Sequence, residues 1–355
     1  ASCRLGTTRT NSRGPPRRAA TSEKNIQPRD HHPMSAEGPV VALAGGVGGA
    51  KLAVGLAKAL PSGALTVIVN TADDLTLHGL HISPDLDTVM YNLAGLSDPS
   101  QGWGIKGDTY GALDLLGLYG GPTWFRLGDK DMATHIRRTQ RLSEGTRLTV
   151  VTAELCAALD IKSRVLPMTD SPVATRVQTP EGELEFQDYF VARGTRPKVT
   201  GVRFQGADEA RATPEVLEAI GAARTIVYCP SNPMVSLGPI LAIKDISEKL
   251  QNLPGIPRVG VSPIIGGAAL RGPAADMLNS LGHEVSALGV AEIMREYLDG
   301  YIFDDKDTHL MPSFEERGIA AMTAQSVMTD TSSKTTLARV VLDFADKFRD
   351  PPPTN

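Results

Sequence analysis

Short apolar runs alternate along the chain with segments in which apolar residues recur every three or four positions. Residues 39–44 and 65–70 are such runs, and they predict buried parallel strands. Residues 51–60, between them, place leucine and alanine on one face, which predicts a helix. Further strands are expected at 225–229, 258–262, 284–288 and 301–304, and further helices at 84–96, 213–223, 237–253, 274–281, 290–298 and 335–348. This rhythm predicts an α/β fold: a doubly wound, Rossmann-like, mostly parallel sheet.

The middle of the chain follows a different pattern and predicts a smaller inserted subdomain. Residues 129–142 have the spacing of a basic helix, and the apolar residues 148–152 favour a strand. Residues 164–204 alternate β-branched and polar side chains, as antiparallel strands do. The predicted domains are a core formed by 38–128 and 209–348 and an inserted subdomain at 129–208.

Charge is distributed unevenly between the N-terminal residues and the rest of the chain. The 355 residues carry a net charge of -4, but residues 1–33 contain seven Lys/Arg and two acids, a balance of +5 that leaves -9 elsewhere. Residues 1–37 are expected to be a disordered basic tail, with Met34 as the natural start, and 349–355 a loose tail. Because the remaining chain is acidic, we expect no nucleic-acid partner.

Cysteine usage and hydropathy narrow the class of protein further. The three cysteines, Cys3, Cys156 and Cys229, form no CxxC pair, which excludes a disulfide framework and a cysteine-built zinc site. No apolar run approaches the roughly 20 residues of a membrane helix, so we expect no membrane partner. These features favour a cytoplasmic protein.

A glycine-rich loop follows the first predicted strand and precedes the first helix. Glycines there let backbone N–H groups and a helix N-terminus approach an anion. The loop is neither a Walker A sequence nor a complete dinucleotide fingerprint, because Lys51 takes the place of the last glycine. Tight packing alone is the alternative explanation. The candidate phosphate-binding residues are Gly45, Gly46, Gly48, Gly49 and Lys51.

Two adjacent carboxylates, Asp73 and Asp74, follow the second predicted strand, at the sheet edge where open α/β sheets bind ligands. Carboxylates in such a loop can hold Mg²⁺ or accept a proton from a hydroxyl group, whereas an Asx turn is the structural alternative. Asp85, Asp87, His78 and His81 occur within the next 13 positions. This density favours a functional site.

Four further segments combine polar residues with the composition of a loop or the spacing of a helix. Trp103, Lys106 and Asp108 offer an aromatic surface with neighbouring charges, as a flat polar ring requires. Basic residues at 135–141 share a helix, where a solvated face is the equally weighted alternative. The loops at 229–233 and 262–267 each follow a predicted strand, and loop rigidity could also explain their prolines and glycines.

These segments in this order resemble the 2-phospho-L-lactate transferases of coenzyme F420 biosynthesis, in their bacterial phosphoenolpyruvate or phospholactate form. The resemblance spans about residues 40–278. It is carried by AGGVGGAKLAVGL, NTADD, SPDLDTVMYNLAGL, GWGIKGDTYGAL, WFRLGDKDMATHIRRTQRL, CPSNPMVSLGPIL and SPIIGGAALRGPAADML.

The resemblance implies an Mg²⁺-dependent transferase. It would move a phosphoenolpyruvyl or 2-phospho-L-lactyl group from a guanosine diphosphate-linked donor to the ribityl hydroxyl of the 5-deazaflavin Fo, giving F420-0 or its dehydro form and GMP. It also implies a homodimer. The implied catalytic and metal-binding residues are Asp73 and Asp74, with Asp74, Trp103, Lys106 and Asp108 on the Fo side. The donor's nucleotide and phosphates would meet the glycine loop, Lys51, Ser231, Asn232, Gly266 and Gly267, and its carboxylate would meet His135, Arg137 and Arg138.

Two other function classes compete with this interpretation. A related family, linked to gluconeogenesis and cell-wall regulation, shares the glycine-rich start and binds nucleotide sugars without known turnover. A nicotinamide oxidoreductase is disfavoured, because the second strand ends in Asn70 and Thr71 and provides no ribose-binding acid. The donor's substituent, whether lactyl, enolpyruvyl or glyceryl, differs by a few atoms and is not encoded in any motif.

Overall fold

Seven parallel strands form the central sheet of the computed structural model, which describes residues 38–270 and 272–349. The strands are β1 (Val40–Ala44), β2 (Leu65–Val69), β5 (Arg164–Pro167), β9 (Thr225–Tyr228), β10 (Arg258–Val261), β13 (Gly300–Asp304) and β14 (Ala321–Ala324). Their order is β14-β13-β10-β9-β1-β2-β5, and every neighbouring pair is parallel. The tail predictions for residues 1–37 and 350–355 lie outside the described residues.

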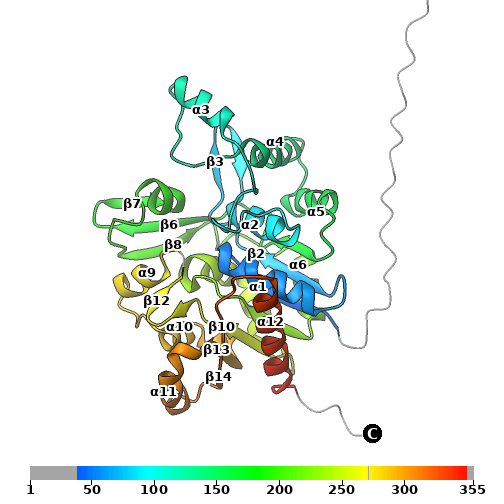
Figure 1. The fold of residues 1–355 in the computed structure, drawn as a ribbon, viewed down its shortest axis with the longest axis vertical. Coiled ribbons are helices and arrows are strands. Elements are labelled where there is room, and N and C mark those ends of the chain that lie inside the picture. The colour runs from blue at the N-terminus through cyan, green and yellow to red at the C-terminus, as the bar shows by residue number, and fades with distance from the viewer. Residues whose placement is uncertain (1–37, 271, 350–355) are drawn as a thin grey trace, which may run out of the picture. The chain divides into compact units, whose positions relative to one another are not determined.

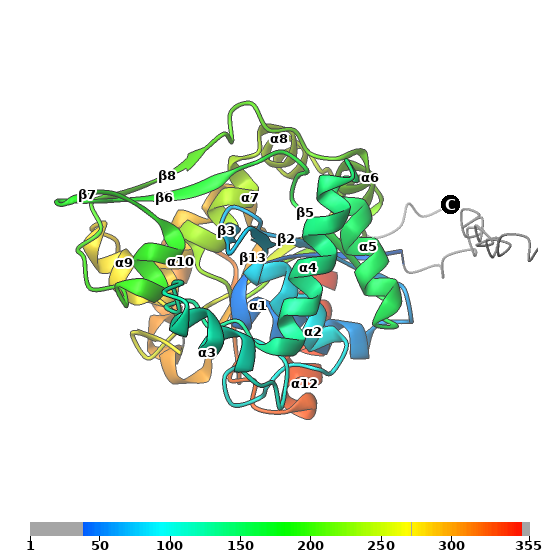
Figure 2. The same ribbon diagram turned by 90° about the horizontal axis from the view of Figure 1, so that it is seen from above.

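Helices cover both faces of this sheet (Figures 1 and 2). One face packs against α1 (Gly46–Ala59), α2 (Pro84–Leu93) and α12 (Thr331–Asp346). The other packs against α6 (Pro214–Ala222), α7 (Gly238–Ala242), α8 (Lys244–Gln251), α9 (Ala274–Ser280), α10 (Ala287–Ile293) and α11 (Met311–Glu316). Alternate residues of β1 enter the two cores, with Val41 and Leu43 in one and Val40 and Ala42 in the other. Burial on both faces explains the uninterrupted apolar runs, and the predicted doubly wound α/β fold is confirmed.

The direction of winding changes at β1. From β1 the chain adds β2 and β5 on one side, and it then adds β9, β10, β13 and β14 in turn on the other. The helices that follow β1 and β9, α1 and α7, therefore lie on opposite faces of the sheet. A crevice opens at such a point in open α/β sheets, and ligands bind there.

The remaining elements lie beyond the carboxyl edge of the sheet or beside it. Three helices, α3 (Gly111–Leu118), α4 (Asp129–Ser143) and α5 (Leu148–Ala158), follow the hairpin of β3 (Leu75–Leu77) and β4 (Leu80–Ile82). A second, antiparallel sheet contains β6 (Ala174–Thr179), β7 (Gly182–Glu185) and β8 (Gly201–Gln205). A short hairpin pairs β11 (Ile264–Ile265) with β12 (Ala268–Ala269), and single helical turns occupy Asp188–Ala192, Pro233–Leu237, Arg295–Tyr297 and Asp305–Leu310.

Several predicted elements need correction. Residues 148–152 are the first part of helix α5, because their apolar run continues at helical spacing to buried Cys156. Residues 284–288 lie in a turn and in the start of α10, where the Ser286 hydroxyl accepts a hydrogen bond from the Gly289 N–H and caps the helix. The predicted helix at 237–253 is divided into α7 and α8 at Ile243, which has extended backbone.

The predicted inserted subdomain does not match one structural unit. Strand β5 lies inside the segment 129–208, yet it pairs with β2 as the edge strand of the central sheet. Only β6 to β8 form a separate sheet. None of the described helices combines the length and the apolar character that a membrane crossing requires.

Candidate active site

A cavity of about 670 Å³ lies at the carboxyl edge of the sheet, where the winding direction changes. The loops after β1, β2, β9 and β10 supply one part of its wall. Another part is aromatic and comes from segments outside the central sheet; it comprises Trp103, Trp124, Phe125, Phe186 and Phe190. A cavity with a few convergent polar groups and a large aromatic wall has the character of a small-molecule site.

The glycine loop forms the start of helix α1. The helix begins at Gly46, earlier than the sequence predicts, and Gly46 has a φ of +63°, which favours glycine. The Gly46 N–H donates to Asp85 Oδ1 at 2.8 Å. Gly45 exchanges two hydrogen bonds with the Ser231 hydroxyl, which accepts from the Gly45 N–H at 3.2 Å and donates to the Gly45 carbonyl at 2.8 Å. The loop after β1 is therefore fixed to the loop after β9.

Gly48 and Lys51 extend this contact between loops. A Cβ atom at Gly48 would lie 2.2 Å from the Pro230 carbonyl oxygen, so the two backbones approach this closely only with glycine there. Lys51 Nζ donates to the Met328 carbonyl at 2.9 Å, which connects α1 to the segment before α12. The predicted loop thus lines the cavity with backbone and one ammonium group.

Asn70, at the end of β2, holds two carboxylates at the cavity wall. Its fully buried side-chain amide donates to Asp73 Oδ2 at 2.9 Å and to Asp85 Oδ2 at 3.0 Å. Desolvation and the charge of Asp85 raise the pKa of Asp73 well above its usual value. Desolvation raises the pKa of Asp85 to about 6. Two carboxyl groups with raised pKa values lie beside the cavity, and a bound cation would favour their ionised forms.

The Oδ1 atom of Asp73 is buried and makes no hydrogen bond of full geometry with the described residues. The neighbouring Thr175 hydroxyl lowers the pKa of Asp73. Buried carboxylate oxygens of this kind are rare unless a metal ion or water completes them.

Asp74 points into a different environment from Asp73. Its Oδ2 accepts from the Ser83 hydroxyl at 2.7 Å and lies 3.0 Å from His81 Nε2. Desolvation raises the pKa of Asp74, and the bond to His81 opposes this. Asp74 does not line the cavity, whereas Asp73 and Asp85 do.

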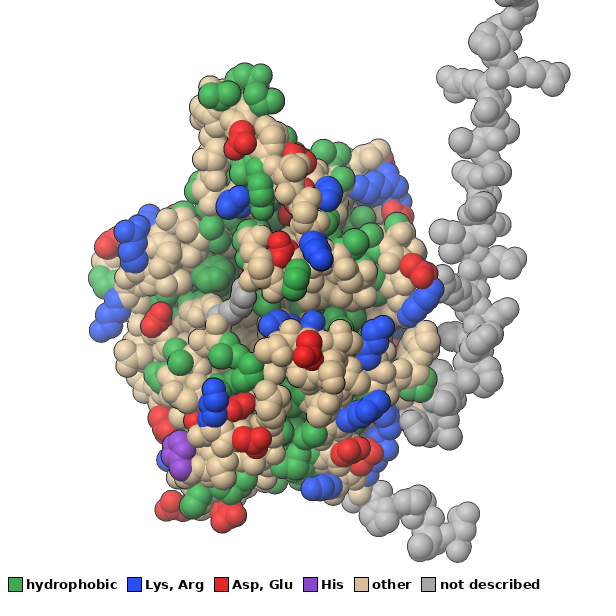
Figure 3. Space-filling view, viewed as in Figure 1, with side chains coloured by type: hydrophobic (Ala, Val, Ile, Leu, Met, Phe, Trp, Pro, Cys, Tyr) green, Lys and Arg blue, Asp and Glu red, His purple; other side chains and the backbone are tan. Residues whose placement is uncertain are grey.

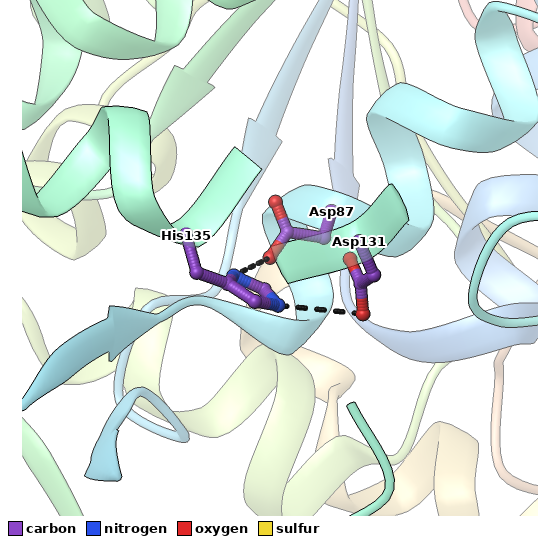
Figure 4. A group of neighbouring side chains, drawn as sticks. All are labelled: Asp87, Asp131 and His135. Carbon is purple, nitrogen blue, oxygen red and sulfur yellow. Dashed lines mark ion pairs between the residues drawn. The ribbon is translucent and has the colours of Figure 1, made fainter. Parts of the chain in front are cut away.

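A buried ionic cluster connects α2 to α4 along the cavity wall. The His135 ring lies between two carboxylates, with Nδ1 3.6 Å from Asp87 Oδ2 and Nε2 3.3 Å from Asp131 Oδ2 (Figure 4). Arg138, fully buried, donates to both oxygens of Asp87, and the Tyr91 hydroxyl donates to Asp131 Oδ1 at 2.6 Å. Because the carboxylates face different nitrogens of one ring, the cluster is better suited to positioning His135 than to holding a metal ion.

The structure brings about half of the predicted site residues to the cavity. Those that line it are Gly45, Gly46, Gly48, Lys51, Asp73, Trp103, His135, Ser231 and Asn232. Those outside its lining are Gly49, Asp74, Lys106, Asp108, Arg137, Arg138, Gly266 and Gly267.

Several of these residues have structural partners that explain why they occur in their motifs. Asp108 accepts hydrogen bonds from the N–H groups of Lys130 and Asp131 and so caps helix α4. The Gly266 N–H donates to Asp307. Asn232 Oδ1 accepts from the N–H of Met234, which caps the following helical turn. The side chains of Asn232 and Ser231 are therefore already engaged in bonds within the protein.

Sequence comparison identifies the relatives of this chain. The family model described as 2-phospho-L-lactate transferase CofD matches residues 40–343. The chain belongs to this family. It is 43% identical over 319 residues to the phosphoenolpyruvate transferase of Streptomyces griseus, covering 87% of this chain and 99% of that protein. It is 41% identical over 303 residues to the 2-phospho-L-lactate transferase of Methanosarcina mazei, covering 85% and 99%.

A solved structure supports the same fold. A UPF0052 family protein from Bacillus halodurans superimposes with a TM-score of 0.57 at 16% identity, covering 86% of this chain and 99% of that one. At this identity the likeness shows the fold alone.

Four residues beside the cavity obtain a defined place only from the structure, although the sequence already shows Asp85 near Asp73 and Asp74. They are Asn70, Asp85, Tyr91 and Asp131. A weak sequence signal exists for Asp85, which stands beside Pro84 at the start of a helix, where carboxylates are common as caps. No local pattern distinguishes a carboxylate that lines a binding cavity from one that only caps a helix.

Proposed function

We propose that this chain transfers a phosphoenolpyruvyl or 2-phospho-L-lactyl group from a guanosine diphosphate-linked donor to the terminal ribityl hydroxyl of Fo. The products would be dehydro-F420-0 or F420-0 and GMP. The reaction would take place in the cytoplasm. Family membership supports the transfer of a phosphate-linked acid, since the relatives are named for it.

One observation carries the proposal: a single cavity joins a glycine loop, a carboxylate pair and an aromatic wall. The glycine loop with Lys51 suits the phosphates of the donor. Trp103 and Trp124 are each about two-fifths exposed and suit the flat face of a deazaflavin ring. A transferase that joins a nucleotide donor to a tricyclic acceptor needs both surfaces in one cavity.

The residues of this site fit a magnesium ion. Asp73 and Asp85 provide carboxylate oxygens held together by Asn70, and both residues line the cavity. Oxygen donors of this kind are the ones that Mg²⁺ prefers. When bound, Mg²⁺ would neutralise charge on the phosphates. In this proposal Asp73 and Asp85 hold the ion, and Asp74 supports the loop through Ser83 and His81.

The other residues act mainly by positioning, which supplies much of the rate in phosphoryl transfer. Gly45 and Gly46 present the loop backbone, and the bonds to Ser231 and Asp85 hold it in place. His135, fixed between Asp87 and Asp131, lines the cavity and is the side chain that we assign to a polar group of the substrate.

A turnover assay tests the proposal. The full chain would be mixed with Fo, Mg²⁺ and the enolpyruvyl-guanosine diphosphate, with the lactyl and glyceryl donors in parallel, and GMP and deazaflavin products would be separated by chromatography. GMP formed in step with modified Fo supports the transferase, and the fastest donor identifies the substituent. Binding of a nucleotide sugar, without Fo binding or turnover, would instead favour a non-enzymatic regulator.

A further inference from the structure

The antiparallel sheet of β6, β7 and β8 is bonded to the loop after β2, which carries Asp73. The Thr175 N–H, on β6, donates to the Ala72 carbonyl at 2.7 Å. The side chain of Gln187, which follows β7, donates from Nε2 to the Asp73 carbonyl at 3.0 Å, across 114 positions of the chain. Two consecutive residues of the loop are therefore held by a part of the chain that lies outside the central sheet.

The neighbours of Gln187 fix where its side chain begins. The rings of Phe186 and Phe190 stack with 5.5 Å between their centroids and 16° between their planes, and Tyr189 is 1% exposed in the same apolar cluster. Gln187 is itself buried, and it lines the large cavity together with Asp73. Because packing holds its backbone and the cavity wall encloses its side chain, the bond to Asp73 has a defined geometry.

The two faces of the antiparallel sheet have different surroundings. Val177 packs in one apolar cluster with Val235 and Met277, which belong to segments beside the central sheet. The opposite face carries ion pairs such as Arg203 with Glu183, 2.6 Å apart, and Figure 3 shows charged side chains gathered over β7. The sheet is thus packed on one side and solvated on the other, so the position of Gln187 is set by the fold.

Asp73 is held by two amide side chains at different atoms. Asn70 Nδ2 donates to its carboxylate oxygen Oδ2 at 2.9 Å, whereas Gln187 donates to its main-chain carbonyl. Asn70 Oδ1 also accepts from the Ala72 N–H at 2.9 Å. Fixing the main-chain carbonyl fixes the direction in which the Asp73 side chain leaves the backbone. Both bonds are therefore needed to keep the carboxylate beside Asp85, which shares the Asn70 amide.

We propose that Gln187 is a positioning residue for the cation site. It holds the main chain at Asp73, so that the Asp73 carboxylate stays within reach of the ion that also contacts Asp85. This inference rests on the proposed function, in which these two carboxylates hold Mg²⁺. Groups that hydrogen bond to metal ligands and orient them typically contribute 10–100-fold in metal affinity or activity. Gln187 contributes in this way from a sheet that supplies no ligand.

Manganese binding to the full chain tests the positioning role without turnover. Mn²⁺ accepts the same oxygen ligands as Mg²⁺, and the paramagnetic resonance signal of the free ion measures its dissociation constant. Gln187→Met removes the donor and keeps the length of the side chain, and the dissociation constant should rise roughly tenfold or more. Gln178→Met is the matched control, since Gln178 is exposed on β6 and outside the cavity lining; its dissociation constant should equal that of wild type.

Magnesium dependence of turnover separates positioning from a merely structural role. In Gln187→Met the Mg²⁺ concentration for half-maximal rate should rise by the same factor, saturating Mg²⁺ should restore most of kcat, and the KM for Fo should stay within about twofold. A structural role alone would lower the melting temperature of the metal-free variant and leave both metal constants unchanged. Gln187→Asn, with an amide one methylene shorter, gives the same test should Gln187→Met not fold.

Two negative results have different meanings. Wild-type binding of Mn²⁺ that neither Gln187 variant weakens would overturn the positioning role alone and leave the proposed function standing. A wild-type chain that binds no Mn²⁺ would overturn the assignment of Asp73 and Asp85 to the ion, and the role of Gln187 with it.

Discussion

The pair of Arg138 and Asp87 allows a quantitative test of how the wall of the active site is held. Arg138 is fully buried, and Asp87 is 4% exposed. The guanidinium donates to both carboxylate oxygens of Asp87. Arg138→Met removes the partner of a buried carboxylate while keeping much of the apolar stem.

The expected cost follows from the partners that remain. Breaking a buried ion pair costs about 3–5 kcal/mol, since the remaining charge is left desolvated. His135 stays 3.6 Å from Asp87 and compensates in part, so we expect the free energy of unfolding to fall by about 3 kcal/mol. The double variant Asp87→Leu with Arg138→Met should lose less than the single variant, because no unpaired charge remains.

Equilibrium urea unfolding followed by circular dichroism at pH 7 measures these changes. Arg137→Met is the matched control on the same helix; its guanidinium is half exposed and 3.8 Å from Glu154, and its loss should change stability by less than about 0.5 kcal/mol. The refuting result is an Arg138→Met variant with wild-type stability and a raised KM for the donor. Arg138 would then contact substrate, as the family resemblance implies, and the structural role argued here would be wrong.

Three further predictions concern the site and the pH dependence of stability. Asp85→Asn should keep the fold and lower kcat by roughly 10²-fold or more, since the cation site loses a charge; a variant with normal kcat would contradict this assignment. Gly48→Ala should fail to hold the loop after β1 in place, because its Cβ would lie 2.2 Å from the Pro230 oxygen, and a wild-type melting temperature would refute this. The hydrogen bond from Arg147 lowers the pKa of Glu215 from 4.5 to about 2, so Glu215 stabilises the fold above pH 4.5 and loses that effect as pH falls toward 2. Glu215→Gln should therefore cost about 1 kcal/mol at pH 7, after allowance for solvent screening, and nothing at pH 2, as thermal unfolding at both pH values would show.

The strands of the central sheet could be predicted from the sequence, because a strand that is buried on both faces is a continuous run of apolar residues. Val40 to Ala44 and Leu65 to Val69 are wholly apolar except for one threonine, and parallel strands covered by helices on both sides require this. The strand predicted at 148–152 failed for the same reason: a buried helix also has continuous apolar residues, and only its length reveals it. Strand β5 was assigned to an insertion because chain order does not report that it returns to pair with β2.

Whether a site residue could be predicted depends on how far apart in the chain its partners lie. Gly45, Gly46 and Asp73 could be predicted, because loops at the carboxyl ends of adjacent parallel strands must meet at one edge of the sheet. The role of Asn70 depends on Asp85, which reaches it from the start of α2. A spacing of 15 residues across a hairpin contains no information about such a contact.

Charge alone does not identify a residue that lines the cavity of this chain. Arg138, which the resemblance assigns to the donor carboxylate, is fully buried in the protein. Arg126, which the sequence analysis did not select, lines the cavity. Both arginines lie within residues 124–142, one of the segments that carry the family resemblance. The two arginines differ because the carboxylate of Asp87 neutralises Arg138 inside the wall. This ion pair holds α2 against α4. The buried pair of Arg138 and Asp87 therefore stabilises the cavity wall. The surface of the cavity itself is lined by aromatic residues and by the glycine loop.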